Sequence, residues 1–116
     1  NANEIPEGAG NTAKSTLELL KDAKAINGQL YVERNVMDEI GAAEARGVDF
    51  SKLARSIQSV RPSTEPGRIS QVVKYSDSQG MKYVIHEVID GNGVLLHRDF
   101  DSIRILSGQI INKIGG

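Results

Sequence analysis

Two histidines and an aspartate in the second half of the chain are the residues best suited to acid–base chemistry. They are His86, His97 and Asp99, and the chain has no third histidine. Imidazole ordinarily titrates near neutral pH, so one ring can accept a proton while another donates one. A carboxylate beside the two rings can orient them. The elements around these residues decide whether they meet.

The segment that carries them predicts a β-hairpin. Apolar and polar residues alternate over residues 81–89 and 94–100, and the intervening DGNG is a strong short-turn signal. A two-residue loop, whether Gly-Asn or Asn-Gly, gives the same sidedness because side chains alternate with period two. In one register His86 lies opposite His97, and in the other it lies opposite Asp99 with His97 diagonal. Both registers predict a cluster of two imidazoles and one carboxylate.

The opposite face of this hairpin is the predicted core face. Its apolar residues are Met81, Tyr83, Ile85, Ile89, Val94, Leu96 and Phe100. Glu87 and Arg98 lie among them. As a structural pair they form a cross-strand salt bridge of modest strength. As an alternative catalytic pair they place a carboxylate base beside a phosphate-binding arginine.

A pair of imidazoles suits the cleavage of RNA without a metal ion. The 2′-hydroxyl of the substrate is then the nucleophile, so no Ser or Cys nucleophile is required. The predicted phosphate-binding residues are Arg68, Lys74 and Lys82, with Arg104 on a neighbouring strand as a further cation.

Two other interpretations of the histidine pair stay open. In most proteins, two histidines on a half-exposed sheet face are tolerated surface or interface residues. A metal site is less favoured, because a third histidine or a cysteine is missing and only Asp99 is left as a partner. The sequence therefore predicts neither a metal nor a cofactor.

Composition narrows the range of functions. The 116 residues are 39% hydrophobic and 25% charged, as in ordinary globular domains, and no cysteine is present to form a disulfide or a thiolate metal site. The formal net charge is −1. Nonspecific nucleic-acid binders are usually basic, because neutralised phosphates supply most of their affinity. Binding of RNA would therefore depend on a local cluster of cations.

Helical signals fill the first half of the chain. Ser15 and Glu18 have the spacing of a capping box, and an apolar stripe at helical period predicts a helix that stops at Asn27-Gly28. A second helix is predicted over residues 31–46. Asp49 is the expected N-cap of a short third helix over residues 50–57.

Strand signals fill the second half. Strands are predicted over residues 69–75, 81–89, 94–100 and 103–106, and the tail QIINKIGG is either a short edge strand or a frayed end. We therefore expect an α+β fold with N-terminal helices packed on one face of a C-terminal four-stranded antiparallel sheet. Residues 1–12 read as a polar linker, and residues 13–116 as a single domain.

The stretch GRISQVVKYSDSQGMKYVIHEVIDGNGVLLHRDF, residues 67–100, places sparse His, Arg and acidic residues on antiparallel strands, and the linker-like NANEIPEGAGN precedes the helices. This organisation resembles the microbial-ribonuclease type of toxin domain, which includes barnase-like, colicin-like and contact-dependent inhibition nucleases. The resemblance implies cleavage of RNA, often tRNA or rRNA, by a module exported within a larger secreted protein and active in the cytoplasm of target bacteria.

The same resemblance implies partners. A tight acidic immunity protein is expected in the producing cell, and no membrane insertion by this domain is expected. The near-neutral charge departs from the more basic toxin nucleases. A host-cell protein, or a structured RNA read through few contacts, would then have to supplement the affinity.

The competing function is a non-catalytic protein-interaction module, such as an immunity or adaptor protein. The acidic net charge and the lack of one identifying motif favour it. A small-ligand binding domain is a third class, which no residue positively supports. Toxicity on cytosolic expression, relieved by a neighbouring gene, would distinguish a toxin from an adaptor.

Overall fold

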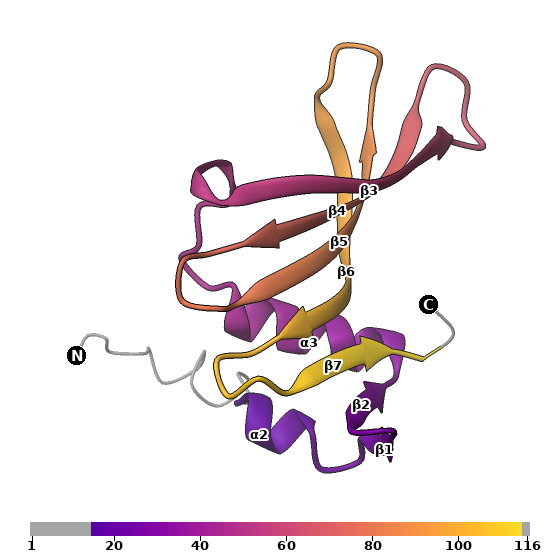
Figure 1. Cartoon of the computed structure of the whole chain (residues 1–116). Coiled ribbons are helices and arrows are strands. Elements are labelled where there is room, and N and C mark those ends of the chain that lie inside the picture. Colours follow the sequence, from indigo (N-terminus) through magenta and orange to yellow (C-terminus); the bar gives the residue numbers. More distant parts are fainter. Residues whose placement is uncertain (1–14, 115–116) are drawn as a thin grey trace, which may run out of the picture.

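The computed structural model describes residues 15–114, and its main feature is one mixed sheet. The strands are β1 (Lys24–Ile26), β2 (Gln29–Val32), β3 (Ala54–Pro62), β4 (Ile69–Ser76), β5 (Lys82–Ile89), β6 (Leu95–Arg104) and β7 (Ile110–Lys113). Their order across the sheet is β1-β2-β7-β6-β5-β4-β3. β2 and β7 run parallel, and the other neighbours run antiparallel (Figure 1).

The described helices are α2 (Thr16–Leu19) and α3 (Arg34–Glu44), with a 3-10 turn at Phe50–Lys52. α3 lies against β6 and β7 (Figure 1). Gly41 allows this close approach, because a Cβ added there would lie 2.2 Å from Cδ1 of Phe100. α2 in turn contacts α3 through a hydrogen bond from the Thr16 hydroxyl to the Glu44 carboxylate.

The hydrophobic core lies between α3 and the covered face of the sheet. Its buried members are Val32, Met37, Ile40, Val73, Tyr75, Met81, Tyr83, Ile85, Ile103 and Ile111. They come from α3, from five strands and, in the case of Met81, from the residue before β5, so the core spans both halves of the chain. Phe50 closes one end of it, with its ring edge-on to Tyr75 and Tyr83 at centroid distances of 5.0 and 5.2 Å.

The expected four-stranded antiparallel sheet covered by N-terminal helices is wrong. The sheet has seven strands and one parallel pair, and α3 is the helix that packs directly on it. The first predicted helix stops at Leu19. Asn27 and Gly28, both at positive φ, form the turn between β1 and β2 instead of ending a helix. Pairing of β2 with β7 outweighs the local helical pattern here.

Other boundaries also differ. The second helix begins three residues later than expected, at Arg34, because Tyr31 belongs to β2. The third helix is only a 3-10 turn capped by Asp49, after which the chain extends as β3. Residues predicted as two strands form the single long β6. The tail becomes β7, which is an interior strand between β2 and β6.

Some expectations hold. The capping box of Ser15 and Glu18 is confirmed, with both of its hydrogen bonds formed. The predicted linker over residues 1–12 lies outside the described part of the chain. Over residues 15–114, no helix has the length and apolar character needed to cross a membrane.

The turn between β5 and β6 differs from the predicted two-residue loop. The backbone N–H of Asp90 donates to the carbonyl of Val94 at 3.0 Å, so residues 91–93 form a three-residue loop. Gly93, at φ 83°, takes the left-handed conformation that such loops require. Val94 and Leu96, expected in the core, are 55% and 44% exposed at this end of the hairpin.

A β-bulge compensates for the longer loop. Leu96 is an extra residue on β6 between the pairs Ile89↔Leu95 and Val88↔His97. It shifts the pairing back by one, so that His86 lies opposite Asp99 and Glu87 lies opposite Arg98. The predicted sidedness is therefore confirmed beyond the bulge, although the predicted loop is not.

We expect Gly41→Ala to destabilise the protein. Alanine favours a helix by up to about 1 kcal/mol over glycine, but the new Cβ would overlap the Phe100 ring. Such overpacking costs about 1–3 kcal/mol, and the net loss should appear in urea unfolding. In a Phe100→Ala background the ring is gone, so the same substitution should be neutral or stabilising. Purely additive effects of the two changes would contradict this contact.

Candidate acid–base site

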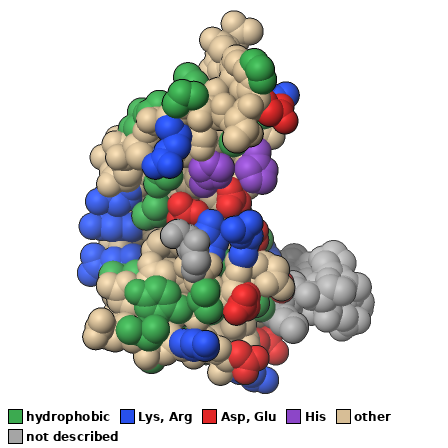
Figure 2. Space-filling model, turned by 90° about the vertical axis from the view of Figure 1, so that its right-hand side faces the viewer, with side chains coloured by type: hydrophobic (Ala, Val, Ile, Leu, Met, Phe, Trp, Pro, Cys, Tyr) green, Lys and Arg blue, Asp and Glu red, His purple; other side chains and the backbone are tan. Residues whose placement is uncertain are grey.

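The face of the sheet opposite α3 carries a cluster of two imidazoles around one carboxylate. Oδ1 of Asp99 lies 2.9 Å from Nδ1 of His86 and 3.2 Å from Nε2 of His97. The ring centroids of the two histidines are 6.2 Å apart. Figure 2 shows the histidines side by side on the surface, with acidic and basic side chains directly below them. We call these three residues the His–Asp–His cluster.

The three members of the cluster differ in accessibility. The His97 side chain is 60% exposed, that of His86 is 30% exposed, and that of Asp99 is 16% exposed. The carboxylate therefore forms the floor, and the imidazoles form a rim that solvent reaches. An external molecule would meet His97 first.

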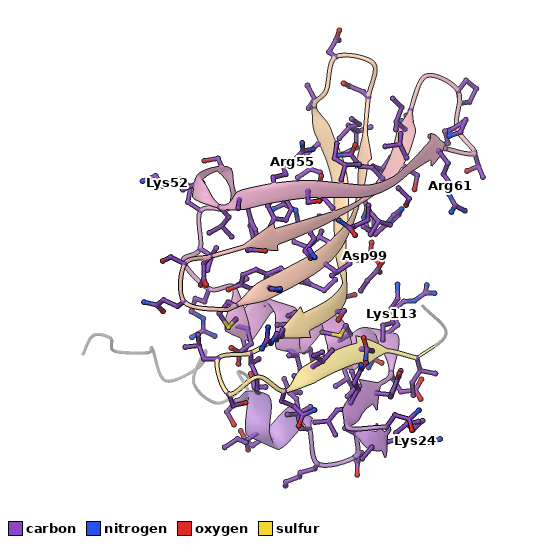
Figure 3. All side chains as sticks on the ribbon, viewed as in Figure 1. Lys24, Lys52, Arg55, Arg61, Asp99 and Lys113 are labelled. Carbon is purple, nitrogen blue, oxygen red and sulfur yellow. The ribbon has the colours of Figure 1, made fainter. Side chains whose placement is uncertain are left out.

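Two further residues contact this cluster. The Ser70 hydroxyl, on β4, lies 2.6 Å from Nε2 of His86. Nζ of Lys113, at the end of β7, lies 2.9 Å from Oδ1 of Asp101 and 3.7 Å from Oδ2 of Asp99. Asp99 and Lys113 come from neighbouring strands on the same side of the molecule (Figure 3). The site therefore draws on four strands.

The local strand geometry explains how Lys113 arrives there. Asp101 is an extra residue on β6, between the pairs Ile85↔Phe100 and Val84↔Ser102. β7 pairs with β6 only from Ser102 onward, where it meets Asn112. Lys113, the next residue, therefore reaches the bulged stretch of β6 where two carboxylates converge.

The predicted alternative pair, Glu87 and Arg98, lies on the other face in a buried hydrogen-bond cluster. Glu87 is 3% exposed. It accepts hydrogen bonds from the Tyr75 hydroxyl at 2.6 Å, from the Gln71 amide at 3.0 Å and from the Arg98 guanidinium at 3.0 Å. The Arg98 guanidinium also stacks over the Phe50 ring, 4.8 Å from its centroid.

These contacts favour the structural interpretation of that pair. Burial alone would raise the pKa of the Glu87 carboxyl, but hydrogen bonds from Tyr75, Gln71 and Arg98 outweigh it and hold the pKa below its usual value. Burial and the contact with Glu87 raise the pKa of the Tyr75 hydroxyl, which therefore keeps its proton and donates it. A carboxylate occupied by three donors is a poor general base.

The predicted phosphate-binding residues form two groups. Lys74 and Lys82 line a cavity of about 290 Å³ on the histidine face, together with Val84, Ser102, Arg104, Gly108 and Ile110. Arg68 lies at the other end of β4, where it forms an ion pair with Glu65. It lines a cavity of about 420 Å³ beside Arg61. The His–Asp–His cluster lies between these cationic groups along the strands.

Ser70 and Lys113 were not among the predicted site residues. Ser70 could have been found by extending the alternation across β4, which puts residues 70, 72 and 74 on the face of His86. Lys113 had no such signal. Its segment reads as an edge strand or a frayed end, and its place depends on a parallel pairing with β2 that the local sequence does not indicate.

In comparisons with known proteins, no protein-family model, curated protein or solved structure matches the chain.

We expect Glu87→Gln to destabilise the fold at pH 7 by about 1–3 kcal/mol, because it leaves the Arg98 guanidinium without its counter-charge. The pKa of Glu87 is lower in the folded chain than its ordinary value of 4.5. Its contribution to stability is therefore present above that value and is lost as the pH falls through the folded pKa. The gap in unfolding free energy between wild type and Glu87→Gln should narrow below about pH 5.

Glu65→Gln is the matched control, since Glu65 is an exposed partner of Arg68. It should change stability by less than about 1 kcal/mol. A gap between wild type and Glu87→Gln that stays constant from pH 7 to pH 3 would show that the carboxylate is not the stabilising group.

Proposed function

We propose that this chain is a metal-independent ribonuclease, and that it acts as a toxin module on RNA in target bacteria. The observation that carries the proposal is the single oxygen of Asp99 shared by His86 and His97. Two imidazoles held together on an open surface can supply the acid and the base that cleavage of RNA needs. The toxin role rests on the resemblance of residues 67–100 and of the preceding linker to microbial-ribonuclease toxins.

In the proposed reaction each ring has its own role. His97 points Nε2 at Asp99, which leaves its other nitrogen, Nδ1, available to take the proton of the substrate 2′-hydroxyl. The 2′-oxygen then bonds to phosphorus as the bond from phosphorus to the 5′-oxygen breaks. His86, as an imidazolium whose Nδ1–H is held by Asp99, gives the proton on Nε2 to the leaving 5′-oxygen, which replaces the Ser70 hydroxyl as the partner of that nitrogen. The products are a 2′,3′-cyclic phosphate and a free 5′-hydroxyl.

Cationic side chains on either side of the His–Asp–His cluster would bind the phosphates of the RNA. Lys74, Lys82 and Arg104 lie on the same face as His86. Lys82 is four residues along β5 from His86, about 13 Å in an extended strand. Phosphates flanking the cleaved bond would bind there, while Arg68 extends the path in the other direction. This local cluster is what RNA binding requires in a chain whose net charge is −1.

Ser70, His86 and Asp99 also lie in the order hydroxyl, imidazole, carboxylate that activates a serine nucleophile. In the proposed reaction Ser70 instead positions His86, because RNA brings its own nucleophile. The two roles differ in their substrate. Cleavage by 2′-hydroxyl attack requires a ribose at the cleaved bond, whereas attack by Ser70 does not.

A non-catalytic interaction module is the alternative, and one observation favours it. The ends of the β3–β4 and β5–β6 hairpins, which project together in Figure 1, carry exposed apolar side chains. These are Val60, Ile69, Val94, Leu95 and Leu96. Apolar residues grouped on a surface are typical of a protein-binding site. An immunity protein of the proposed toxin could also bind there.

His86→Ala and His97→Ala should each lower kcat/KM for RNA by about 10²–10⁴-fold, because each removes a proton-transfer group. Cleavage of tRNA and of a single-stranded RNA oligonucleotide measures this directly. The oligonucleotide with a 2′-deoxyribose at the cleaved position should stay intact. Ser70→Ala should retain more activity than either histidine variant.

Lys24→Ala is the control, since Lys24 lies far from Asp99 in Figure 3. The exposed His97 should be replaceable without loss of fold, which thermal unfolding verifies. Full activity in both histidine variants would refute the assigned site. Normal growth on expression of the wild-type chain would favour the interaction module. Cleavage of the deoxyribose substrate would make Ser70 the nucleophile.

Lys74→Ala, Lys82→Ala and Arg104→Ala should weaken RNA binding and reduce the slope of log affinity against log salt by about 1 each. Fluorescence anisotropy of a labelled RNA over a range of salt concentrations measures both effects. Lys24→Ala removes a cation that lies far from Asp99 in Figure 3, and it should leave the slope unchanged. A slope in the three cavity variants equal to that of Lys24→Ala would show that this cavity does not bind the RNA backbone.

A further inference from the structure

We propose that the His–Asp–His cluster also binds one transition-metal ion, with Zn²⁺ as the best fit, and that this ion inhibits the RNA cleavage proposed above. Metal binding concerns the cluster alone, whereas inhibition rests on the proposed function. Zn²⁺ binds imidazole nitrogen and carboxylate oxygen. The sequence alone disfavours a metal here, because it offers only three ligands. Three protein ligands with water in the fourth position are nevertheless the usual ligand set of catalytic Zn²⁺ sites.

The distances fit such an ion. One ligand atom from each of His86, His97 and Asp99 lies within 4.8 Å of the others. Tetrahedral Zn²⁺ has bonds of about 2.0–2.1 Å, which places its ligands about 3.3 Å apart. The two separations from Oδ1 of Asp99, 2.9 and 3.2 Å, are already close to that value. The third closes if the exposed His97 side chain rotates toward His86.

Ser70 provides an independent reason to assign a metal. A histidine that binds a metal through one nitrogen usually donates the N–H of the other to an oxygen, which fixes its tautomer and orientation. Nε2 of His86 lies 2.6 Å from the Ser70 hydroxyl. When Nε2 carries the proton and donates to Ser70, the lone pair of Nδ1 points to the place where Asp99 and His97 converge.

The positive charge of Lys113 lies beside the carboxylate that would bind the metal ion. Its ammonium lies 3.7 Å from the second oxygen of Asp99 and 2.9 Å from Asp101. The ammonium therefore competes with a cation for Asp99, while Asp101 draws it aside. Removing the ammonium should strengthen metal binding. A merely structural role of Lys113 would not produce that change.

Metal and acid–base chemistry exclude each other at this cluster. A metal on Nε2 of His97 leaves Nδ1 of that ring as an N–H, which cannot take the 2′-hydroxyl proton. A metal on Nδ1 of His86 keeps that ring neutral, so it no longer supplies a proton to the leaving oxygen. The bound ion would therefore abolish cleavage.

Isothermal titration of the full chain with ZnCl₂ tests the metal site. We expect one ion per chain, with no binding by His97→Ala. Ser70→Ala should bind about 10–100-fold more weakly, and Lys113→Met should bind more tightly than wild type. Asp22→Asn, which changes an exposed carboxylate away from the cluster, is the matched control and should bind as wild type does. In the RNA assay, ZnCl₂ should stop cleavage and a chelator should restore it.

The outcomes separate the two proposals. Absence of binding by the wild type, or equal binding by His97→Ala, overturns the metal site and leaves the ribonuclease proposal standing. Zn²⁺ binding by a chain that cleaves no RNA when metal-free upholds the site and overturns the ribonuclease. Faster cleavage with Zn²⁺ overturns the inhibitory role.

Discussion

The pairing of β5 with β6 is the constraint on which the rest of the structure depends. A slip of one residue would turn every side chain of one strand to the opposite face. It would carry His97 and Asp99 into the core and expose Phe100, against which α3 packs at Gly41. Two bulges, at Leu96 and Asp101, change the register of β6 against β5. The four pairs between the bulges are regular, and they run from Ile85↔Phe100 to Val88↔His97.

Neighbouring residues of this hairpin point to opposite faces, one of which stabilises the fold while the other carries the candidate site. Glu87 is buried and fully hydrogen-bonded, whereas His86 beside it lies on the open face. A buried carboxylate costs free energy unless it is hydrogen-bonded, so Glu87 disfavours any register that separates it from Tyr75 and Arg98. The open face carries no such cost. Residue types on the open face are free to serve a chemical role, because the buried face already specifies the pairing of β5 with β6.

The sequence predicted the contents of the central hairpin better than its surroundings. Alternation over residues 81–100 was enough to put His86, His97 and Asp99 on one face, because period two survives when a longer loop is offset by a bulge. It did not decide whether His86 lies opposite His97 or opposite Asp99. The helix predicted from residues 17–26 is mostly wrong, although their apolar spacing suits a helix. Residues 24–26 form β1, which pairs with β2, and β2 in turn pairs with β7 from the far end of the chain. Such long-range pairing leaves no local pattern. Lys113, which β7 brings to Asp99, was unpredictable for that reason.

Asp99 gives the open face its chemical character. One of its oxygens receives both imidazoles, and the other lies near the ammonium of Lys113, which Asp101 holds aside. The same nitrogen lone pairs can hold protons or coordinate a cation, but they cannot do both at once. Because the net charge of the chain is −1, little long-range attraction draws either a metal ion or RNA to it. Contacts at short range must therefore select what the cluster binds, and the ammonium of Lys113 beside Asp99 opposes the binding of a cation there.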